Sequence, residues 1–172
     1  PGLDRPIDHR ERLRIHGDGT VVVDDEVALP ATLDDLPRIG ARFEVPAHLD
    51  LLEWYGRGPL ETYADRESSE QLGRWRSRVA DQYVPYVLPQ EHGNHTDTRW
   101  FVLADGPIDE GGTGLLVSST DRLEPLGFSA RHHHDADLIA ATTTAELQMS
   151  STIEVHVDLT QRGLGTATCG PD

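Results

Sequence analysis

Apolar and polar residues alternate in short runs along most of the chain, and Gly or Pro residues separate these runs. The clearest run covers residues 152–159, where aliphatic residues alternate with Glu154, His156 and Asp158. A period of two predicts a strand with one face in the core and the other face in solvent. The same reasoning predicts further strands at 12–15, 20–24, 26–29, 41–45, 51–55, 99–103, 114–118, 126–130 and 138–140.

Helical spacing is rare by comparison. Residues 68–80 place Leu72, Trp75 and Val79 on one helical face. An internal Gly weakens this pattern, so we predict a single helical turn there. Repeated short strands with Gly and Pro turns indicate an all-β fold, an antiparallel β-sandwich. The predicted core consists of Phe43, Val45, Leu52, Trp54, Tyr86, Ile153, Val155 and Val157.

Charge and composition narrow the classes of partner. The net charge is −15, from 30 acidic and 15 basic residues, and every basic residue is Arg. An acidic chain lacks the cationic surface that nucleic acid or an anionic membrane requires, so we expect neither partner. No run approaches the roughly 18 apolar residues of a membrane helix, and the N-terminus does not resemble a signal peptide. The single Cys169 excludes an internal disulfide, so we expect a cytoplasmic location.

Two segments combine rigid backbone with polar side chains. Residues 51–66 join a predicted strand to a loop in which Gly58 and Pro59 restrict the path of the chain. Residues 81–100 place amide, carboxylate and imidazole groups between Tyr86 and Trp100. Such mixtures bind sugars, because aromatic faces contact C–H groups while polar groups bond the hydroxyls. The alternative, that both segments are hydrogen-bonded structural corners, stays open.

These segments also resemble a known family. Residues 54–66 fit the W-x-G-x-G-P-x-E-x-Y-x-D-R signature of the C-terminal domain of glycoside hydrolase family 2 β-galactosidases. Residues 81–100 are similar to the family's segment that ends in P-Y-x-x-P-Q-E-x-G-N-x-x-x-x-R-W, and residues 158–165 are similar to its D-x-x-Q-x-G-x-G turn. The resemblance implies a supersandwich like that of galactose mutarotase. It also implies that residues 1–172 form a single domain, truncated relative to the family's own.

The resemblance further implies which domain of a parent enzyme carries out catalysis. Terminal β-D-galactosides such as lactose are hydrolysed in a separate barrel domain, which holds both catalytic glutamates, and parent enzymes of the family often use Mg and Na. We therefore expect no catalytic residue, cofactor or hydrolysis in this chain alone, and an ancillary role at the active-site mouth. The expected partners are the catalytic barrel domain, the galactoside, and other copies of the chain in a homo-oligomer. A free-standing carbohydrate-binding module and a separately encoded small subunit are the alternatives.

Candidate sugar contacts come from the two specific matches. The tryptophan that one branch of the family places near the sugar has no counterpart in residues 166–172. Residues 131–135 include three consecutive His, but neighbouring strand residues point to opposite faces, so we predict an exposed polar edge and no metal site. The predicted substrate-binding residues are Gly58, Glu61, Tyr63, Asp65, Gln90, Glu91, Asn94 and Arg99.

Overall fold

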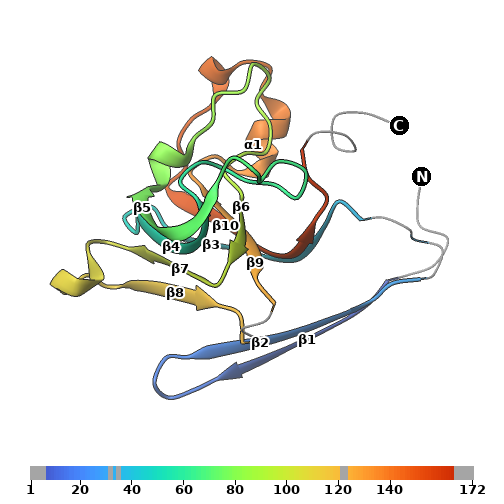
Figure 1. The fold of residues 1–172 in the computed structure, drawn as a ribbon, viewed down its shortest axis with the longest axis vertical. Helices are drawn as coiled ribbons and strands as arrows, with labels where there is room; N and C mark the ends of the chain where they lie inside the picture. The colour runs from blue at the N-terminus through green and yellow to red at the C-terminus, as the bar shows by residue number, and fades with distance from the viewer. Residues whose placement is uncertain (1–6, 31–32, 34–35, 121–123, 165–172) are drawn as a thin grey trace. The chain divides into compact units, whose positions relative to one another are not determined.

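A computed structural model describes residues 7–30, 33, 36–120 and 124–164 (Figure 1). Contacts divide the chain into two compact units, residues 1–36 and residues 37–172. The single-domain assignment for residues 1–172 stays a prediction. None of the helices in the described ranges is long and apolar enough to cross a membrane. Residues 166–172, which lack a counterpart of the family tryptophan, lie outside the described residues.

The first unit contains a β-hairpin. Strands β1 (Asp8–Ile15) and β2 (Val21–Ala28) pair antiparallel along their whole length. Gly19 in the turn has a φ of 89°, which a residue without a side chain adopts without strain. The Asp18 carboxylate accepts a 2.9 Å hydrogen bond from the backbone N–H of Thr20. The strands predicted at 12–15, 20–24 and 26–29 are therefore confirmed, as the two arms of one hairpin.

The second unit consists of two four-stranded antiparallel sheets. One has the order β3-β10-β9-β6 and the other the order β5-β4-β7-β8. Short helical segments connect the strands: η1 (Val79–Gln82), η2 (Ile108–Glu110), α1 (Asp135–Ala140) and η3 (Thr144–Glu146). The predicted all-β antiparallel sandwich is confirmed, whereas its likeness to a supersandwich stays a prediction. The strands are β3 (Arg38–Pro46), β4 (Leu51–Gly58), β5 (Gln71–Arg78), β6 (His95–Thr98), β7 (Trp100–Ala104), β8 (Gly114–Ser118), β9 (Leu126–Arg131) and β10 (Thr152–Gln161).

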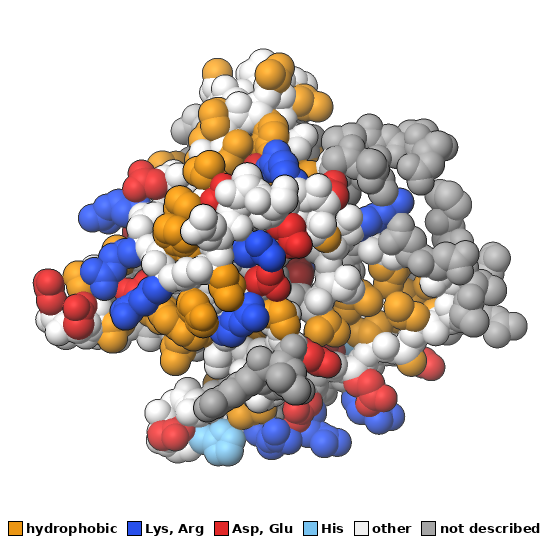
Figure 2. All heavy atoms as spheres, in the orientation of Figure 1, with side chains coloured by type: hydrophobic (Ala, Val, Ile, Leu, Met, Phe, Trp, Pro, Cys, Tyr) orange, Lys and Arg blue, Asp and Glu red, His pale blue; other side chains and the backbone are white. Residues whose placement is uncertain are grey.

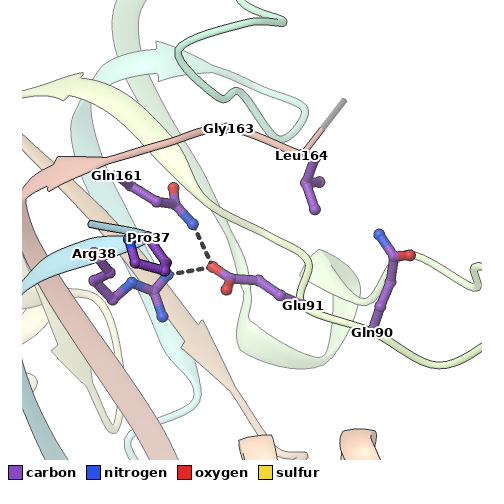
Figure 3. A pocket seen from close by; sticks show the side chains of 7 residues that line it. All are labelled: Pro37, Arg38, Gln90, Glu91, Gln161, Gly163 and Leu164. Carbon is purple, nitrogen blue, oxygen red and sulfur yellow. Dashed lines mark hydrogen bonds and ion pairs between the residues drawn. The ribbon is translucent and has the colours of Figure 1, made fainter. Parts of the chain in front are cut away.

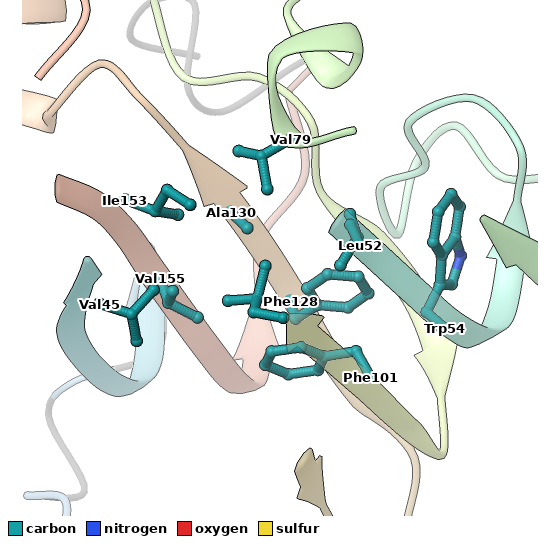
Figure 4. Packing of buried hydrophobic residues seen from close by; sticks show 10 residues of the cluster. Val45, Leu52, Trp54, Val79, Phe101, Phe128, Ala130, Ile153 and Val155 are labelled. Atoms are coloured by element: carbon teal, nitrogen blue, oxygen red, sulfur yellow. The ribbon is translucent and has the colours of Figure 1, made fainter. Parts of the chain in front are cut away.

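The hydrophobic core draws side chains from strands of both sheets (Figure 4). Phe101 on β7 stacks on Phe128 on β9, with ring centroids 4.2 Å apart. Among the predicted core residues, Phe43 and Val157 are only half-buried, although both pack against the core. Tyr86 lies outside the core and is half-buried, because its hydroxyl bonds to a loop carboxylate. The prediction is confirmed for Val45, Leu52, Trp54, Ile153 and Val155, all of which are buried.

The predicted helical turn within residues 68–80 is wrong for most of that segment, which forms strand β5. β5 pairs with β4, and Trp75 lies directly opposite Trp54. Arg74 and Arg76 both donate to the carboxylate of Glu53 on β4. Cross-strand packing and ion pairing therefore outweigh the weak helical spacing of this segment.

The strand predicted at 138–140 is also wrong, because these residues end helix α1. Asp135 and Asp137 lie in its first turn, where negative charge favours a helix. Leu138 is buried while Ile139 is 85% exposed, so only one side of this short helix packs inward.

Strand β10 differs from the predicted half-buried strand on its polar side. Glu154, His156 and Asp158 are all buried, as is Val155 between the first two, whereas Val157 is half-buried. Leu159 is instead 61% exposed, because the pairing of β10 with β3 shifts register between Asp158 and Thr160. The alternating pattern correctly predicted that Glu154, His156 and Asp158 share one face of the strand. That face is buried by the protein and is not exposed to solvent.

Candidate functional site

The buried polar face of β10 meets charged residues from β9 and α1. Arg131 lies opposite Glu154 in the β9–β10 ladder, and its side chain is fully buried. The guanidinium donates to Asp135 at 2.6 Å and lies 3.6 Å from Glu154. Residues 131–135 are therefore not the exposed polar edge that we predicted, because Asp135 at the start of α1 reaches back to pair with Arg131.

Asp135, Glu154 and His156 form the one group of potential metal ligands found among the described residues, with ligand atoms within 4.8 Å of one another. Existing partners already engage these atoms. His156 Nδ1 lies 3.0 Å from Arg38, which can only donate, so His156 Nε2 carries the hydrogen and faces both carboxylates at 3.3 Å. Burial opposes ionisation of Asp135, but the His156 bond and the Arg131 charge hold the pKa of Asp135 far below its usual value. The group is therefore a closed ion-pair network.

Asp158 is the unusual member of this face. Its carboxyl group is buried, and burial raises its pKa to about 6, although the nearby charge of Arg38 opposes the rise. Arg38 Nε lies 3.0 Å from Asp158 Oδ1, but neither carboxylate oxygen has a well-aligned hydrogen bond within the described structure. Asp158 thus titrates near pH 6, beside Arg38, which also pairs with Glu91.

A pocket of about 270 Å³ opens beside Arg38 (Figure 3). Glu91 is its central group: the carboxylate pairs with Arg38 and accepts a 2.6 Å hydrogen bond from Gln161 Nε2. The Gln161 Oε1 atom has no partner among the described residues. Donors and acceptors thus meet in one concave site, the combination that hydroxyl-rich ligands require. The pocket is lined by Pro37, Arg38, Gln90, Glu91, Gln161, Gly163 and Leu164.

Loop 59–66 lies next to this pocket, and its polar residues mainly shape the loop. The Glu61 carboxylate accepts from Arg66, from the Tyr86 hydroxyl and, at 2.7 Å, from the Gly93 N–H. Asp65 accepts a 3.1 Å bond from the N–H of Leu164 and so fixes the pocket's edge. These contacts favour the structural interpretation of Glu61 and a positioning role for Asp65.

The remaining predicted contacts lie at different places. Tyr63 is fully buried, its hydroxyl lacks a partner within the described residues, and burial raises its pKa well above the usual value. Gly58 packs against two tryptophan rings, and buried Asn94 donates a 2.8 Å bond to the Thr62 carbonyl. Arg99 donates to the Asp97 carbonyl. Of the eight predicted residues, only Gln90 and Glu91 line the pocket.

Sequence reasoning missed Arg38 and Gln161 as pocket residues. Gln161 belongs to the D-x-x-Q-x-G-x-G match, so the resemblance contained a signal for it. Arg38 belongs to none of the three motif matches, so the sequence contained no signal for it. It reaches the pocket because β3 pairs with β10, which places Arg38 opposite Gln161.

Comparison with known proteins identifies the family to which the chain belongs. The family model described as "Beta galactosidase small chain" matches residues 3–172. The chain belongs to this family. The predicted resemblance to the small-chain domain of β-galactosidases is thereby confirmed. The family model covers the pocket residues and the loop 59–66 together.

Three β-galactosidases that are similar to this chain are much longer proteins. The chain is 32% identical over 151 residues to a β-galactosidase of Priestia megaterium, a match that covers 88% of this chain and 14% of the relative. It is 34% identical over 138 residues to a β-galactosidase of Arthrobacter sp., a match that covers 79% of this chain and 13% of the relative. It is 40% identical over 90 residues to a β-galactosidase of Vibrio cholerae, a match that covers 52% of this chain and 9% of the relative. The chain therefore spans about one seventh or less of these relatives.

Proposed function

We propose that this chain is the ancillary C-terminal part of a β-galactosidase, which shapes the active-site mouth and contacts the galactoside without supplying the catalytic carboxylates. The family match over residues 3–172 carries this proposal. Named relatives are β-galactosidases of which the matched region is a small fraction, so catalysis by the remainder of the parent chain is the simplest arrangement. Hydrolysis of terminal β-D-galactosides such as lactose, and any Mg or Na, then belong to the parent's barrel domain.

The polar pocket supports the carbohydrate contact. Glu91 accepts from Arg38 and Gln161, while Gln161 Oε1 is free to accept from a ligand hydroxyl. A glycosidase needs two carboxyl groups on either side of the scissile bond. Glu91 is already held by two protein donors, and Glu61 by three. Both carboxylates thus serve binding or architecture rather than acid–base catalysis.

Binding of galactose or lactose to the 172-residue chain tests the carbohydrate contact. We expect millimolar affinity, about −4 kcal/mol, because the barrel wall that completes the pocket is absent from this chain. Amide chemical shifts of residues 90, 91, 161 and 163 should move in NMR titrations. Glu91→Gln should weaken binding, because it removes the charge that holds Arg38. Glu26→Gln in the hairpin, which also loses an arginine partner, is the matched control.

Three outcomes would redirect the proposal. Micromolar affinity would favour the free-standing carbohydrate-binding module, since no barrel would then be needed. Shifts confined to residues 131–135 would show that another surface binds the sugar. A barrel coding segment in the same reading frame upstream supports the ancillary domain, whereas one in a neighbouring frame supports a separately encoded small subunit that assembles with its catalytic chain.

A further inference from the structure

A second pocket, of about 150 Å³, lies in the unit formed by residues 37–172 and shares no lining residue with the first. Its charged or ionisable lining residues include one arginine and three histidines. None of the described residues that line it is a carboxylate or an amide, although the chain as a whole has a net charge of −15. The lining residues are Val79, Ala80, Tyr83, His92, Arg131, His132, His133 and Met149.

Arg131 supplies the permanent charge of this pocket. Its Nη2 atom is engaged by Asp135 at 2.6 Å. Its Nε and Nη1 atoms are buried and have no hydrogen-bond partner within the described ranges. Arginine nitrogens can only donate, and a buried donor without an acceptor costs about 1–3 kcal/mol. A ligand with acceptor oxygens would recover that cost.

Two of the imidazoles also present unused nitrogens. His132 Nε2 is held 3.1 Å from the Asp50 carboxylate, while its Nδ1 has no partner. His92 is 2% exposed, and neither ring nitrogen makes a hydrogen bond of normal geometry. Burial, and then the Arg131 charge, lower the pKa of His92 to about 4, although the nearby Gln82 carbonyl opposes this. At neutral pH, His92 is therefore uncharged and has one N–H, for which the Gln82 carbonyl is the nearby protein acceptor.

The rest of the wall is apolar or aromatic. The Tyr83 ring meets the His92 ring edge-on at 5.0 Å and the His133 ring at 5.1 Å, so both imidazoles are held by packing. Val79 and Met149 complete the wall. Drug-sized ligands occupy pockets of roughly 300–1,000 Å³, so this pocket suits a much smaller molecule.

We propose that this pocket binds a small carboxylate, with Arg131 and His92 donating to its oxygens and with Val79, Tyr83 and Met149 contacting a short hydrocarbon body. The charge-assisted bonds from a guanidinium favour a carboxylate over a neutral hydroxyl. The apolar wall favours an organic acid over inorganic phosphate, which has no hydrocarbon part to bury. Asp50 and Asp135 pair with His132 and Arg131 and do not line the pocket.

Ligand chemistry provides the first test. Acetate and propionate are titrated into the 172-residue chain at pH 7 and constant ionic strength, and the ring resonances of His92 and Tyr83 are followed by NMR. We expect saturable shifts, with propionate binding more tightly than acetate. The neutral isosteres acetamide and propionamide should bind at least about tenfold more weakly, a difference of about 1.4 kcal/mol. Equal binding of acid and amide, or stronger binding of phosphate, would overturn the proposal.

Variants provide the second test. His92→Phe keeps a ring against Tyr83 but removes both nitrogens, and it should weaken propionate binding about fivefold or more. His134→Phe is the matched control, because His134 bonds Thr152 and does not line the pocket. Arg131→Gln should abolish binding, and if that variant does not fold, the two histidine variants still decide. Equal affinity in His92→Phe and wild type would refute the proposal. Saturating galactose should leave propionate binding unchanged, so this test is independent of the sugar pocket.

Discussion

Replacing Asp158 by Asn should change how the stability of the protein depends on pH. The folded state raises the pKa of Asp158 from 3.8 to about 6, chiefly by burial. The folded protein therefore binds this proton more tightly than the unfolded chain, and the wild type loses stability as pH rises between these two values. The full difference corresponds to about 3 kcal/mol. Between pH 5 and pH 8 the expected part is about 1.4 kcal/mol, because the unfolded carboxyl is already largely ionised at pH 5 and the rest of the loss occurs below that pH.

Urea unfolding monitored by tryptophan fluorescence at pH 5 and pH 8 measures this effect. Both values lie above the isoelectric point of about 4.8. The free energy of unfolding of Asp158→Asn, minus that of wild type, should be about 1.4 kcal/mol larger at pH 8 than at pH 5. The constant part of that difference contains altered contacts with Arg38, so only its change with pH is diagnostic. Asp81→Asn, at an exposed site, is the control. A difference that does not vary with pH would refute the assigned burial of an ionisable Asp158.

Three further predictions follow from the packing and the proposed function. Trp54→Ala should cost about 3–5 kcal/mol of unfolding free energy, because Trp54 is fully buried and donates to the Arg57 carbonyl; a loss below about 1 kcal/mol in urea unfolding would contradict its core position. Gly58→Ala should cost about 1–3 kcal/mol, since a Cβ atom there would lie 2.8–2.9 Å from two tryptophan rings, whereas Gly106→Ala, with nothing within 4 Å, should be nearly neutral. The chain alone should not hydrolyse a nitrophenyl galactoside, and an activity that disappears on mutating Glu91 would end the ancillary-domain proposal.

Several local features were predictable because they depend on neighbouring residues. Alternation located β10 and the hairpin, since a strand that buries one face needs apolar residues at every second position. The motif matches identified the small-chain family, and they also pointed to Glu91 as a pocket residue. Residues 71–78 show the limit of local reasoning. Their weak helical spacing was overruled by pairing with β4, where Trp75 meets Trp54.

The sequence by itself determined an all-β chain, its main strand positions and its family, because periodicity and short motifs are read over a few consecutive residues. Only the tertiary structure decided what covers each strand face. The polar face of β10 is buried because Arg38 and Arg131 come from β3 and β9, on either side of it in the same sheet. Both pockets likewise combine segments far apart in the chain. Their chemistry depends on burial and long-range ion pairing, which no local pattern of residues records.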